Sequence, residues 1–349
     1  MNSVDQILLA WYAVHGRELP WRTTRDPYLI WLSEIILQQT RVDQGTAYYL
    51  RFVERFPRVD LLAQAPEDEV LKLWQGLGYY SRARNLHAAA QQIVNDFGGQ
   101  FPTTYDAVRS LRGVGDYTAA AITSAAFDLP YAAVDGNGYR VLSRLYDVAT
   151  PIDSTQGHRE FQALATATMA QAKPSLYNQA VMDLGAMICT PRSPRCEECP
   201  LHAKCQAAAA GTIADRPVKQ GKTKVRERWF NYLDLRSVGE AVLLRRGAGD
   251  IWQGLYEFPL IETAQEADFK TLAQQADFIR WVGSEWTLEQ ETSLPAHRLS
   301  HQLIHAVVWQ ISVPRFTPDA RIWSISEDDI AQRAVPRLLE RYLMKKGEL

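Results

Sequence analysis

The chain has 349 residues, of which 46% are apolar and 22% are charged, proportions close to those of ordinary globular proteins. This composition argues against a disordered, collagen-like or fibrous protein, and the length predicts about two domains. With 38 Lys and Arg against 40 Asp and Glu, the formal net charge is −2. That balance alone counts against a strongly basic nucleic-acid binder.

Membrane and export signals are not evident in the sequence. No apolar run approaches the roughly 18 uncharged residues of a membrane span. The first ten residues include Asp5 and lack the basic start and small-residue cleavage site of a secretory signal. We therefore expect a cytoplasmic protein that does not bind membranes.

Residues 1–210 have the pattern of an all-α domain. Asp26 followed by Pro27 predicts a helix start, with proline at the first helical position. The predicted helices span residues 28–40, 60–73, 82–97, 104–111, 118–127, 138–146, 158–172, 175–188 and 207–210.

A change of pattern follows this helical part. Residues 211–225 are rich in Gly, Thr and Lys and predict a linker. Residues 226–349 predict an α+β domain. Its predicted strands span 230–235, 240–246 and 305–313, and its predicted helices span 264–276 and 327–344.

All four cysteines, Cys189, Cys196, Cys199 and Cys205, lie within 17 residues and are spaced C-x6-C-x2-C-x5-C. Disulfides of a secreted protein are rarely crowded in this way. Four thiolates from one loop suit tetrahedral zinc or an iron–sulfur cluster. The wide first spacing favours the cluster, which implies a reducing compartment, and zinc remains the alternative.

Glu34 lies in an apolar stretch, residues 28–37, that predicts a buried helix. An ionised carboxylate there is costly unless it is paired or protonated. Desolvation raises a carboxyl pKa, so Glu34 is a candidate proton donor near neutral pH. The alternative is a glutamate that is bonded to a neighbouring helix terminus.

Two glycine-containing turns are further candidates. Gly113, Val114 and Gly115 lie between two predicted helices, where backbone amides and a helix dipole can face a phosphate; many such turns are plain connections. Asp135, in the sequence Val-Asp-Gly-Asn, is either a helix cap or a second catalytic carboxylate. Paired carboxylates often cleave glycosidic bonds.

Together these motifs resemble the helix-hairpin-helix DNA glycosylases with an iron–sulfur loop, and within them the adenine DNA glycosylase (MutY) branch. The matching segments, in order over roughly residues 15–205, are LPWR (19–22), SEIILQQT (33–40), WQGLGYY (74–80), GVGDYT (113–118), VDGN (134–137) and the cysteines. GLYEFP (254–259) and LSH (299–301) more loosely resemble the family's C-terminal domain, which is related to Nudix hydrolases.

The resemblance implies a multidomain enzyme of base excision repair. A helical catalytic domain (1–210) with a cluster loop (189–205) would precede a linker (211–225) and a Nudix-like 8-oxoguanine recognition domain (226–349). The enzyme would carry a 4Fe–4S cluster on the four cysteines. It would act as a monomer, near the nucleoid if bacterial, on duplex DNA with adenine opposite 8-oxoguanine or guanine.

The resemblance also assigns residues. Adenine would be flipped out of the duplex, Glu34 would protonate it at N7, and Asp135 would stabilise the sugar cation, with Tyr117 and Asn137 in support. The adenine pocket would comprise Arg17, Leu19, Trp21, Arg22, Leu37 and Gln179. DNA or 8-oxoguanine would be bound by Gln39, Thr40, Leu77, Tyr79, Gly113, Val114, Gly115, Ser300 and His301. Packing alone remains the alternative for Leu19, Trp21, Leu37 and Tyr79.

Tyr117 stands where strand-cleaving relatives such as endonuclease III carry a lysine that forms a Schiff base, which a phenol cannot do. This predicts a monofunctional glycosylase.

After Pro259 the chain lacks the glutamate array of a Nudix hydrolase. Departures from the family pattern are Arg112 for Pro, Gly138 for an apolar residue, Tyr256 for Trp and Leu299 for Phe.

Three competing interpretations remain: a relative directed at thymine or oxidised pyrimidines, a non-catalytic DNA-binding protein, and a Nudix hydrolase.

Positive and negative charges nearly balance in both parts of the chain. Residues 1–225 hold 23 Lys and Arg and 22 Asp and Glu, and residues 226–349 hold 15 Lys and Arg and 18 Asp and Glu. Neither part is basic, so we expect few contacts with DNA phosphates and a DNA affinity that falls only moderately with salt. The candidate cations are Arg192, Arg195, Lys204, Lys219, Lys222 and Lys224.

Overall fold

The computed structural model describes residues 2–221, 225–316 and 322–349, so the candidate cations Lys222 and Lys224 lie outside the described residues. Contacts divide the chain into two compact units, Met1–Gln64 with Asn85–Gly221 and Ala65–Arg84 with Lys222–Leu349. The domain boundaries at 210 and 225 stay a prediction. None of the described helices is long and apolar enough to cross a membrane.

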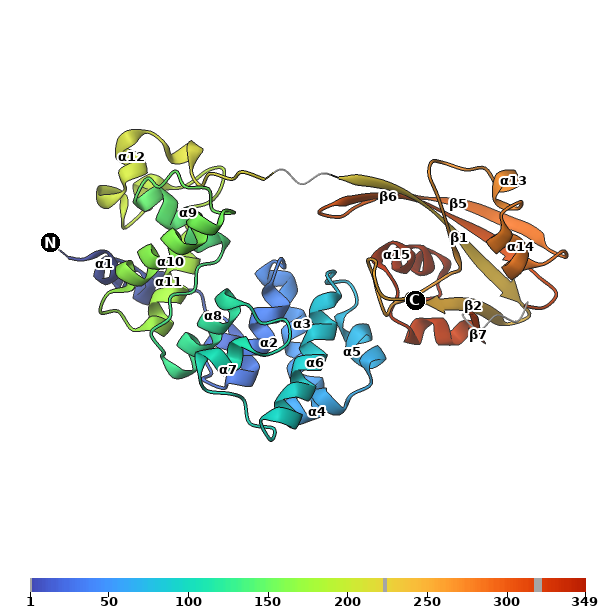
Figure 1. The fold of residues 1–349 in the computed structure, drawn as a ribbon, viewed down its shortest axis with the longest axis horizontal. Helices are drawn as coiled ribbons and strands as arrows, with labels where there is room; N and C mark the ends of the chain where they lie inside the picture. The colour runs from blue at the N-terminus through green and yellow to red at the C-terminus, as the bar shows by residue number, and fades with distance from the viewer. Residues whose placement is uncertain (1, 222–224, 317–321) are drawn as a thin grey trace. The chain divides into compact units, whose positions relative to one another are not determined.

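The first unit is helical, as predicted (Figure 1). Its helices are α1 (Val4–His15), α2 (Pro27–Leu37), α3 (Val42–Arg55), α4 (Val59–Gln64), most of α6 (Ser81–Asp96), α7 (Tyr105–Arg109), α8 (Asp116–Phe127), α9 (Gly136–Leu145), α10 (Thr155–Met169), α11 (Pro174–Met187) and α12 (Gln206–Ala210). Short 3-10 helices span Pro20–Arg22, Cys196–Glu198, His202–Lys204 and Ile213–Asp215.

Two buried helices organise this unit. Helix α2 packs against α3 and α8, and α11 packs against α1, α8 and α9. The α2 start is the predicted one, because the Asp26 carboxylate accepts a hydrogen bond from the Tyr28 amide and Pro27 occupies the first turn. Helix α8 is rich in alanine, and its small buried residues allow the close approach of α2.

Two helices of the first unit were not predicted, α1 and α3. Helix α3 buries Gly45, Tyr49 and Phe52, a helical spacing that the sequence analysis missed. The helix predicted over 60–73 is instead two helices, α4 and α5 (Glu67–Trp74), and α5 belongs to the second unit. Pro66 explains the break, since proline cannot continue a helix from the preceding turn.

The second unit contains a mixed sheet of seven strands among the described residues, in the order β3-β2-β1-β6-β5, with β4 on β1 and β7 on β2. The strands are β1 (Arg226–Ser237), β2 (Glu240–Arg245), β3 (Tyr256–Glu257), β4 (Leu260–Thr263), β5 (Thr287–Arg298), β6 (Gln302–Ser312) and β7 (Ile322–Ser326). Strands β1 and β6 run parallel and the other pairs antiparallel.

Helices cover both faces of this sheet (Figure 1). Phe230 and Tyr232 of β1 point to the face that α15 (Arg337–Lys346) covers. Leu233 and Leu235 point to the opposite face, against α13 (Phe269–Leu272) and α14 (Ala276–Val282). This alternation follows from the two-residue period of a strand, and the predicted α+β class is confirmed.

Two predicted helices of this part are wrong in extent. Residues 264–268 are not helical, and α13 begins only after Asp268, whose carboxylate caps it. The helix predicted over 327–344 is a 3-10 helix (Glu327–Gln332) followed by α15. Pro336 explains the interruption because it disfavours helical geometry in the residue before it. Strand β5 is mostly polar and exposed, and was not predicted.

Candidate active site

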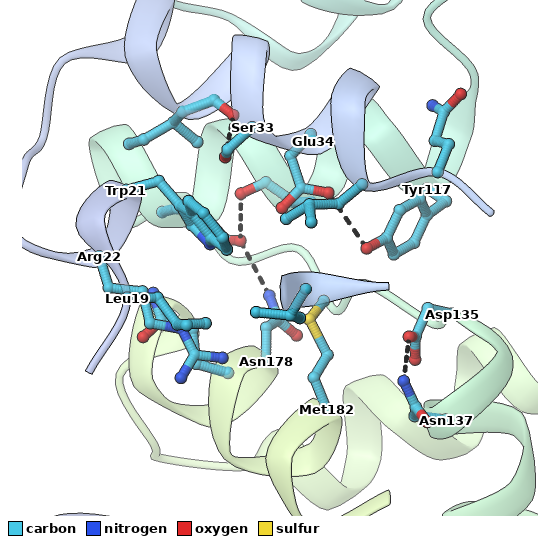
Figure 2. A pocket seen from close by; sticks show the side chains of 18 of the residues that line it. Leu19, Trp21, Arg22, Ser33, Glu34, Tyr117, Asp135, Asn137, Asn178 and Met182 are labelled. Atoms are coloured by element: carbon cyan, nitrogen blue, oxygen red, sulfur yellow. Dashed lines mark hydrogen bonds between the residues drawn. The ribbon is translucent and has the colours of Figure 1, made fainter. Parts of the chain in front are cut away.

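A cavity of about 440 Å³ opens in the first unit and is lined by α2, α8, α11, the 3-10 helix at residues 20–22 and the turn before α9. In Figure 2, Glu34 and Tyr117 face Asp135 and Asn137, while Leu19, Trp21 and Arg22 form another side. These residues come from four segments spread over more than 100 positions, so folding alone brings them together.

Glu34 lies on α2 between buried neighbours, with its carboxyl group bordering the cavity. Its pKa is raised to about 7, chiefly by burial and also by the negative charge of Asp135, although a hydrogen bond from Tyr117 and the charge of Arg22 act in the opposite direction. The Tyr117 hydroxyl donates to Glu34 Oε2 at 3.1 Å. Glu34 therefore retains a proton over part of the neutral range.

Asp135 is a helix cap, the first of the two alternatives that the sequence left open, and its role as a catalytic carboxylate stays a prediction. One carboxylate oxygen accepts from the Gly138 amide at 2.7 Å and so caps α9. The other accepts from Asn137 Nδ2 at 2.7 Å. The carboxylate nevertheless lines the cavity opposite Glu34. The cap and the amide fix its orientation, which is what a preorganised negative charge requires.

The remaining predicted pocket residues also line this cavity. They are Arg17, Leu19, Trp21, Arg22, Leu37 and Gln179, together with Gln39 and Thr40 from the predicted DNA-binding set. Gln179 accepts a hydrogen bond from the Tyr12 hydroxyl at 2.6 Å. Gln39 has a φ of 56° at the end of α2, a conformation that few non-glycine residues adopt.

Several lining residues escaped the sequence analysis, notably Ser33, Ser124, Asn178 and Met182. Asn178 is buried; its amide donates to Ser124 Oγ and to the Tyr131 carbonyl and accepts from the Ala133 amide. For α11, the available signal was the helical spacing of its polar residues Ser175, Asn178, Gln179 and Asp183.

The hairpin glycines do not line this cavity. Gly113 has a φ of 77°, and a Cβ there would lie 2.7 Å from Asn85 Cβ, so glycine is required. Val114 is buried, and Gly115 is the N-cap of α8. The geometry is that of a tight turn leading into a helix start, as predicted.

The four cysteines line one small cavity in the loop after α11. Burial, with a smaller contribution from the charges of the other three thiols, raises the pKa of Cys199 to about 11. Within the described residues no set of three or more His, Cys, Asp or Glu converges as on a single metal ion. Thiols spread around a shared cavity, whose ionised forms repel, fit a polynuclear iron–sulfur core. When bound, its four iron–thiolate bonds tie this loop together.

Two arginines of α9 join the cluster loop to the Asp135 turn. Arg140 donates to Asn137 Oδ1 at 2.8 Å and to the carbonyls of Gly185 and Cys189 at 2.7 and 2.6 Å. Arg144, one turn later, donates to the Thr190 and Pro191 carbonyls and lies 3.4 Å from Cys189 Sγ. Helix α9 thus has the carboxylate at its start and the cysteine loop along its side.

Of the candidate cations in the described residues, Arg192, Arg195 and Lys219 are exposed and Lys204 is half-buried. Arg195 pairs with Glu198 at 2.9 Å and also donates to the Met187 carbonyl. Arg195 is therefore already engaged in contacts within the cluster loop.

Leu77 and Tyr79 belong to the second unit. They lie in a turn in which Gly76, Gly78 and Tyr79 all have positive φ values. Leu77 is buried, whereas the Tyr79 side chain is half exposed. A strained turn that presents an exposed ring is suited to contact with a base.

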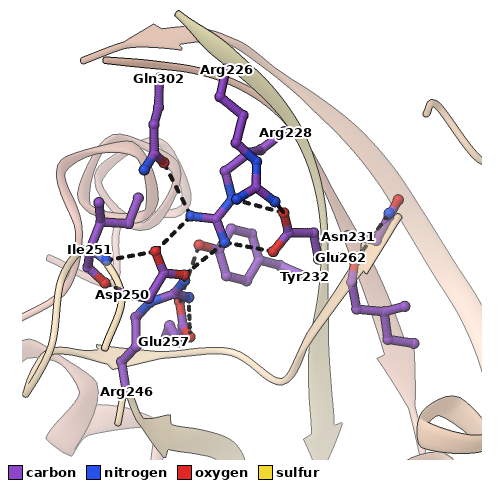
Figure 3. A network of polar contacts seen from close by, with 11 residues as sticks. Arg226, Arg228, Asn231, Tyr232, Arg246, Asp250, Ile251, Glu257, Glu262 and Gln302 are labelled. Atoms are coloured by element: carbon purple, nitrogen blue, oxygen red, sulfur yellow. Dashed lines mark hydrogen bonds and ion pairs between the residues drawn. The ribbon is translucent and has the colours of Figure 1, made fainter. Parts of the chain in front are cut away.

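Ser300 and His301 lie in the turn between β5 and β6, both exposed, with Ser300 Oγ 3.0 Å from His301 Nδ1. Next to this turn, Arg228 donates to Gln302 and binds both Asp250 and Glu262 (Figure 3). The Arg226 amide donates to the His301 carbonyl. A partly buried ionic network centred on the buried Arg228 therefore lies next to the exposed pair.

Known proteins similar to this chain were identified by sequence and by structure. Residues 32–166 match the family described as HhH-GPD superfamily base excision DNA repair protein, residues 189–205 the iron–sulfur binding domain of endonuclease III, and residues 232–345 the NUDIX domain. The adenine DNA glycosylase of Buchnera aphidicola subsp. Baizongia pistaciae is 33% identical over 87% of this chain and 83% of its own length. The adenine DNA glycosylase of Mus musculus is 33% identical over 85% of this chain and 67% of its own length.

The chain belongs to the adenine DNA glycosylase family. Its cofactor is the 4Fe–4S cluster of that family, and the competing zinc interpretation is set aside. The matched segment contains all four cysteines, which stay the predicted ligands. A non-catalytic DNA-binding protein and a Nudix hydrolase are likewise disfavoured, since the family is one of DNA glycosylases.

Solved structures agree on the fold. A thermostable thymine-DNA glycosylase is 32% identical and covers 59% of this chain and 94% of its own, with a TM-score of 0.55. A DNA complex of endonuclease III, 22% identical with a TM-score of 0.52, covers 60% of this chain and supports the fold alone. Both similarities cover about three fifths of this chain and support its fold there.

Replacing Glu34 with Gln tests the burial of its carboxyl group. A raised pKa means that the folded state holds the proton more tightly, so wild-type stability falls as pH rises from the ordinary carboxyl range through about 7. We expect Glu34→Gln to be more stable than wild type above pH 7 by about 2 kcal/mol, since the group borders solvent. At acid pH the two should match. Urea unfolding at both pH values measures this, with exposed Glu54→Gln as control; equal stability at alkaline pH would refute the raised pKa.

Replacing Arg228 with Met tests the network under the Ser300 turn. Burial alone would raise the pKa of Asp250, but the hydrogen bonds from Arg228 and the Ile251 amide, together with Arg246, outweigh it and lower that pKa. The pair therefore stabilises the fold above the ordinary carboxyl range and loses this effect on acidification. We expect Arg228→Met to lower stability near pH 7 by about 2 kcal/mol, below the value for fully buried pairs, with a smaller difference at acid pH. Arg226→Met, whose side chain is 73% exposed, is the matched control and should change little.

Proposed function

We propose that this adenine DNA glycosylase hydrolyses the N-glycosidic bond of adenine opposite 8-oxoguanine or guanine in duplex DNA. The observation that carries the proposal is the placement of two carboxyl groups in one cavity, of which Glu34 has a pKa of about 7. Asp135 is held as a hydrogen-bond acceptor opposite it. One group can donate a proton while the other stabilises positive charge.

The chemistry follows from these positions. Adenine leaves the duplex at an unstacking cost of a few kcal/mol and enters the cavity. Glu34 donates its proton to N7, so the base departs as the neutral molecule when the bond from N9 to the sugar breaks. Asp135 stabilises the cationic sugar, water adds to it, and the proton released by water returns to the carboxylate pair.

Neighbouring groups support each carboxyl group in this scheme. Tyr117 donates to the Glu34 carboxyl group, so it also stabilises the carboxylate that remains after proton transfer. Asn137 holds the second oxygen of Asp135. The apolar side chains of Leu19, Trp21 and Leu37 line the cavity and suit the flat apolar faces of a purine. The phenol of Tyr117 cannot form a Schiff base, which limits the reaction to hydrolysis.

Adenine release from a duplex with adenine opposite 8-oxoguanine, in single turnover, tests this mechanism. We expect Glu34→Gln and Asp135→Asn each to lower the rate by about 10²–10⁴-fold, the range for loss of a positioned acid or charge. Glu54→Gln, on the exposed side of α3, should keep the wild-type rate. If both active-site variants release adenine at the wild-type rate, the proposed mechanism is wrong.

A thymine-directed activity is the second candidate because a thymine-DNA glycosylase covers 59% of this chain at 32% identity. The same assay separates the two when it includes a duplex with thymine opposite guanine. Release of thymine faster than adenine would favour this alternative, while exclusive release of adenine supports the proposal.

Recognition of the opposite base is assigned to Ser300 and His301, which are exposed on the β5–β6 turn, with Leu77 and Tyr79 contacting the duplex. We expect the double change Ser300→Ala/His301→Ala to reduce the preference for 8-oxoguanine over guanine opposite adenine by about 10-fold, the effect of one lost hydrogen bond. Adenine release opposite guanine should change little. A selective loss of release opposite guanine would contradict the assignment.

A further inference from the structure

Asp183 of α11 is a buried carboxylate that the mechanism above does not use. Its side chain is fully buried, at 0% exposure. It accepts hydrogen bonds from the Arg17 amide at 2.9 Å and Arg17 Nε at 2.8 Å, and from Arg22 Nη1 and Nη2 at 2.8 and 2.9 Å. One carboxylate therefore binds two guanidinium groups that line the cavity.

The charges around Asp183 strongly favour its ionised form. Burial alone would raise the pKa of Asp183, but hydrogen bonds from Arg22 and Arg17 outweigh it and lower that pKa. A buried charge is tolerated when it is paired and fully hydrogen-bonded. The fork geometry of Arg22 uses two parallel bonds, the strongest arrangement for a carboxylate.

Arg22, one of the two cations bound to Asp183, also acts on Glu34. The ionisable groups that face Glu34 are Tyr117 of α8, Asp135 before α9 and Arg22, while α3 contributes only Val42 to the cavity. Arg22 is the cation among them, and a nearby cation favours the ionised carboxylate. A guanidinium free to pair with Glu34 would remove the proton that the proposed mechanism needs.

We propose that Asp183 is a positioning residue that binds the guanidinium groups of Arg17 and Arg22 and thereby prevents Arg22 from pairing with Glu34. Its role is to keep the Arg22 cation in an adenine-binding cavity without neutralising the acid. This inference rests on the proposed role of Glu34 as proton donor.

The test is the pH dependence of single-turnover adenine release by Asp183→Asn. In wild type the rate should fall at alkaline pH as Glu34 loses its proton. In Asp183→Asn the midpoint of this fall should lie about 1 pH unit lower, because a nearby cation lowers a carboxyl pKa by at least about that much. Asp183→Glu, which keeps the carboxylate, should return the fall toward the wild-type pH. An unchanged midpoint in a folded Asp183→Asn protein would overturn the inference.

Asp234 of the second unit provides a matched control. It is also 0% exposed and binds Arg236, Tyr342 and Lys346. Asp234→Asn should lower thermal stability while leaving the midpoint of the pH profile unchanged. A midpoint that moves equally in both variants would mean that lost stability explains the effect, and would also overturn the inference.

Arg22→Gln keeps the inference testable where Asp183→Asn does not fold. It removes the cation and leaves Asp183 paired with Arg17, so the midpoint should move to higher pH. An unchanged midpoint would mean that the charge of Arg22 does not act on Glu34, and Asp183 could not work through it. Failure of the proposed function looks different, because then wild type releases no adenine or Glu34→Gln retains the wild-type rate and pH profile.

Discussion

The desolvated carboxyl group of Glu34 is the constraint on which the rest of the first unit depends. A carboxyl group in an apolar helix costs folding free energy when ionised, yet that cost is what raises its pKa into the working range. Its surroundings keep the two tendencies in balance. Tyr117 limits the cost through a hydrogen bond, Asp135 keeps the proton bound by repulsion, and Arg22 is prevented from direct pairing by its fork on Asp183.

The second carboxylate is controlled by backbone structure rather than by desolvation. Asp135 caps α9, so its position follows from the helix start. Through Arg140 and Arg144 the same helix is bonded to the loop that carries the cysteines. Arg140 and Arg144 lie within about three helical turns of Asp135 on α9. A displacement of the cluster loop would therefore be expected to affect the Asp135 turn. The cap makes this turn stiff, and the arginines make it dependent on the loop.

Sequence motifs were sufficient for the centre of the site but not for its supports. Glu34 and Asp135 stand in local patterns, an apolar helix and an Asp-Gly turn, whose physical meaning can be read from neighbours in the chain. Asp183 and Asn178 do their work on partners more than 40 residues away, so no local pattern identifies them. Helix α3 differs from these residues, because the helical spacing of its buried positions is a local pattern that the sequence does contain. The association of Ala65–Arg84 with the sheet depends on long-range contacts that chain order does not reveal.

The placement of the arginines bears on how a nearly neutral chain can be a DNA-binding enzyme. Arg22, Arg144, Arg228, Arg236 and Arg246 have at most a tenth of their side chain or residue exposed, and each binds carboxylates or carbonyl groups inside the protein. These cations organise the two units and are not available to phosphates. The count of 38 Lys and Arg therefore overstates the number of cations that a duplex can meet, and we expect affinity to come from placed contacts and from the base inside the cavity. Because counterion release scales with neutralised phosphates, such an enzyme distinguishes its target through the shape and chemistry of the cavity more than through attraction to DNA in general.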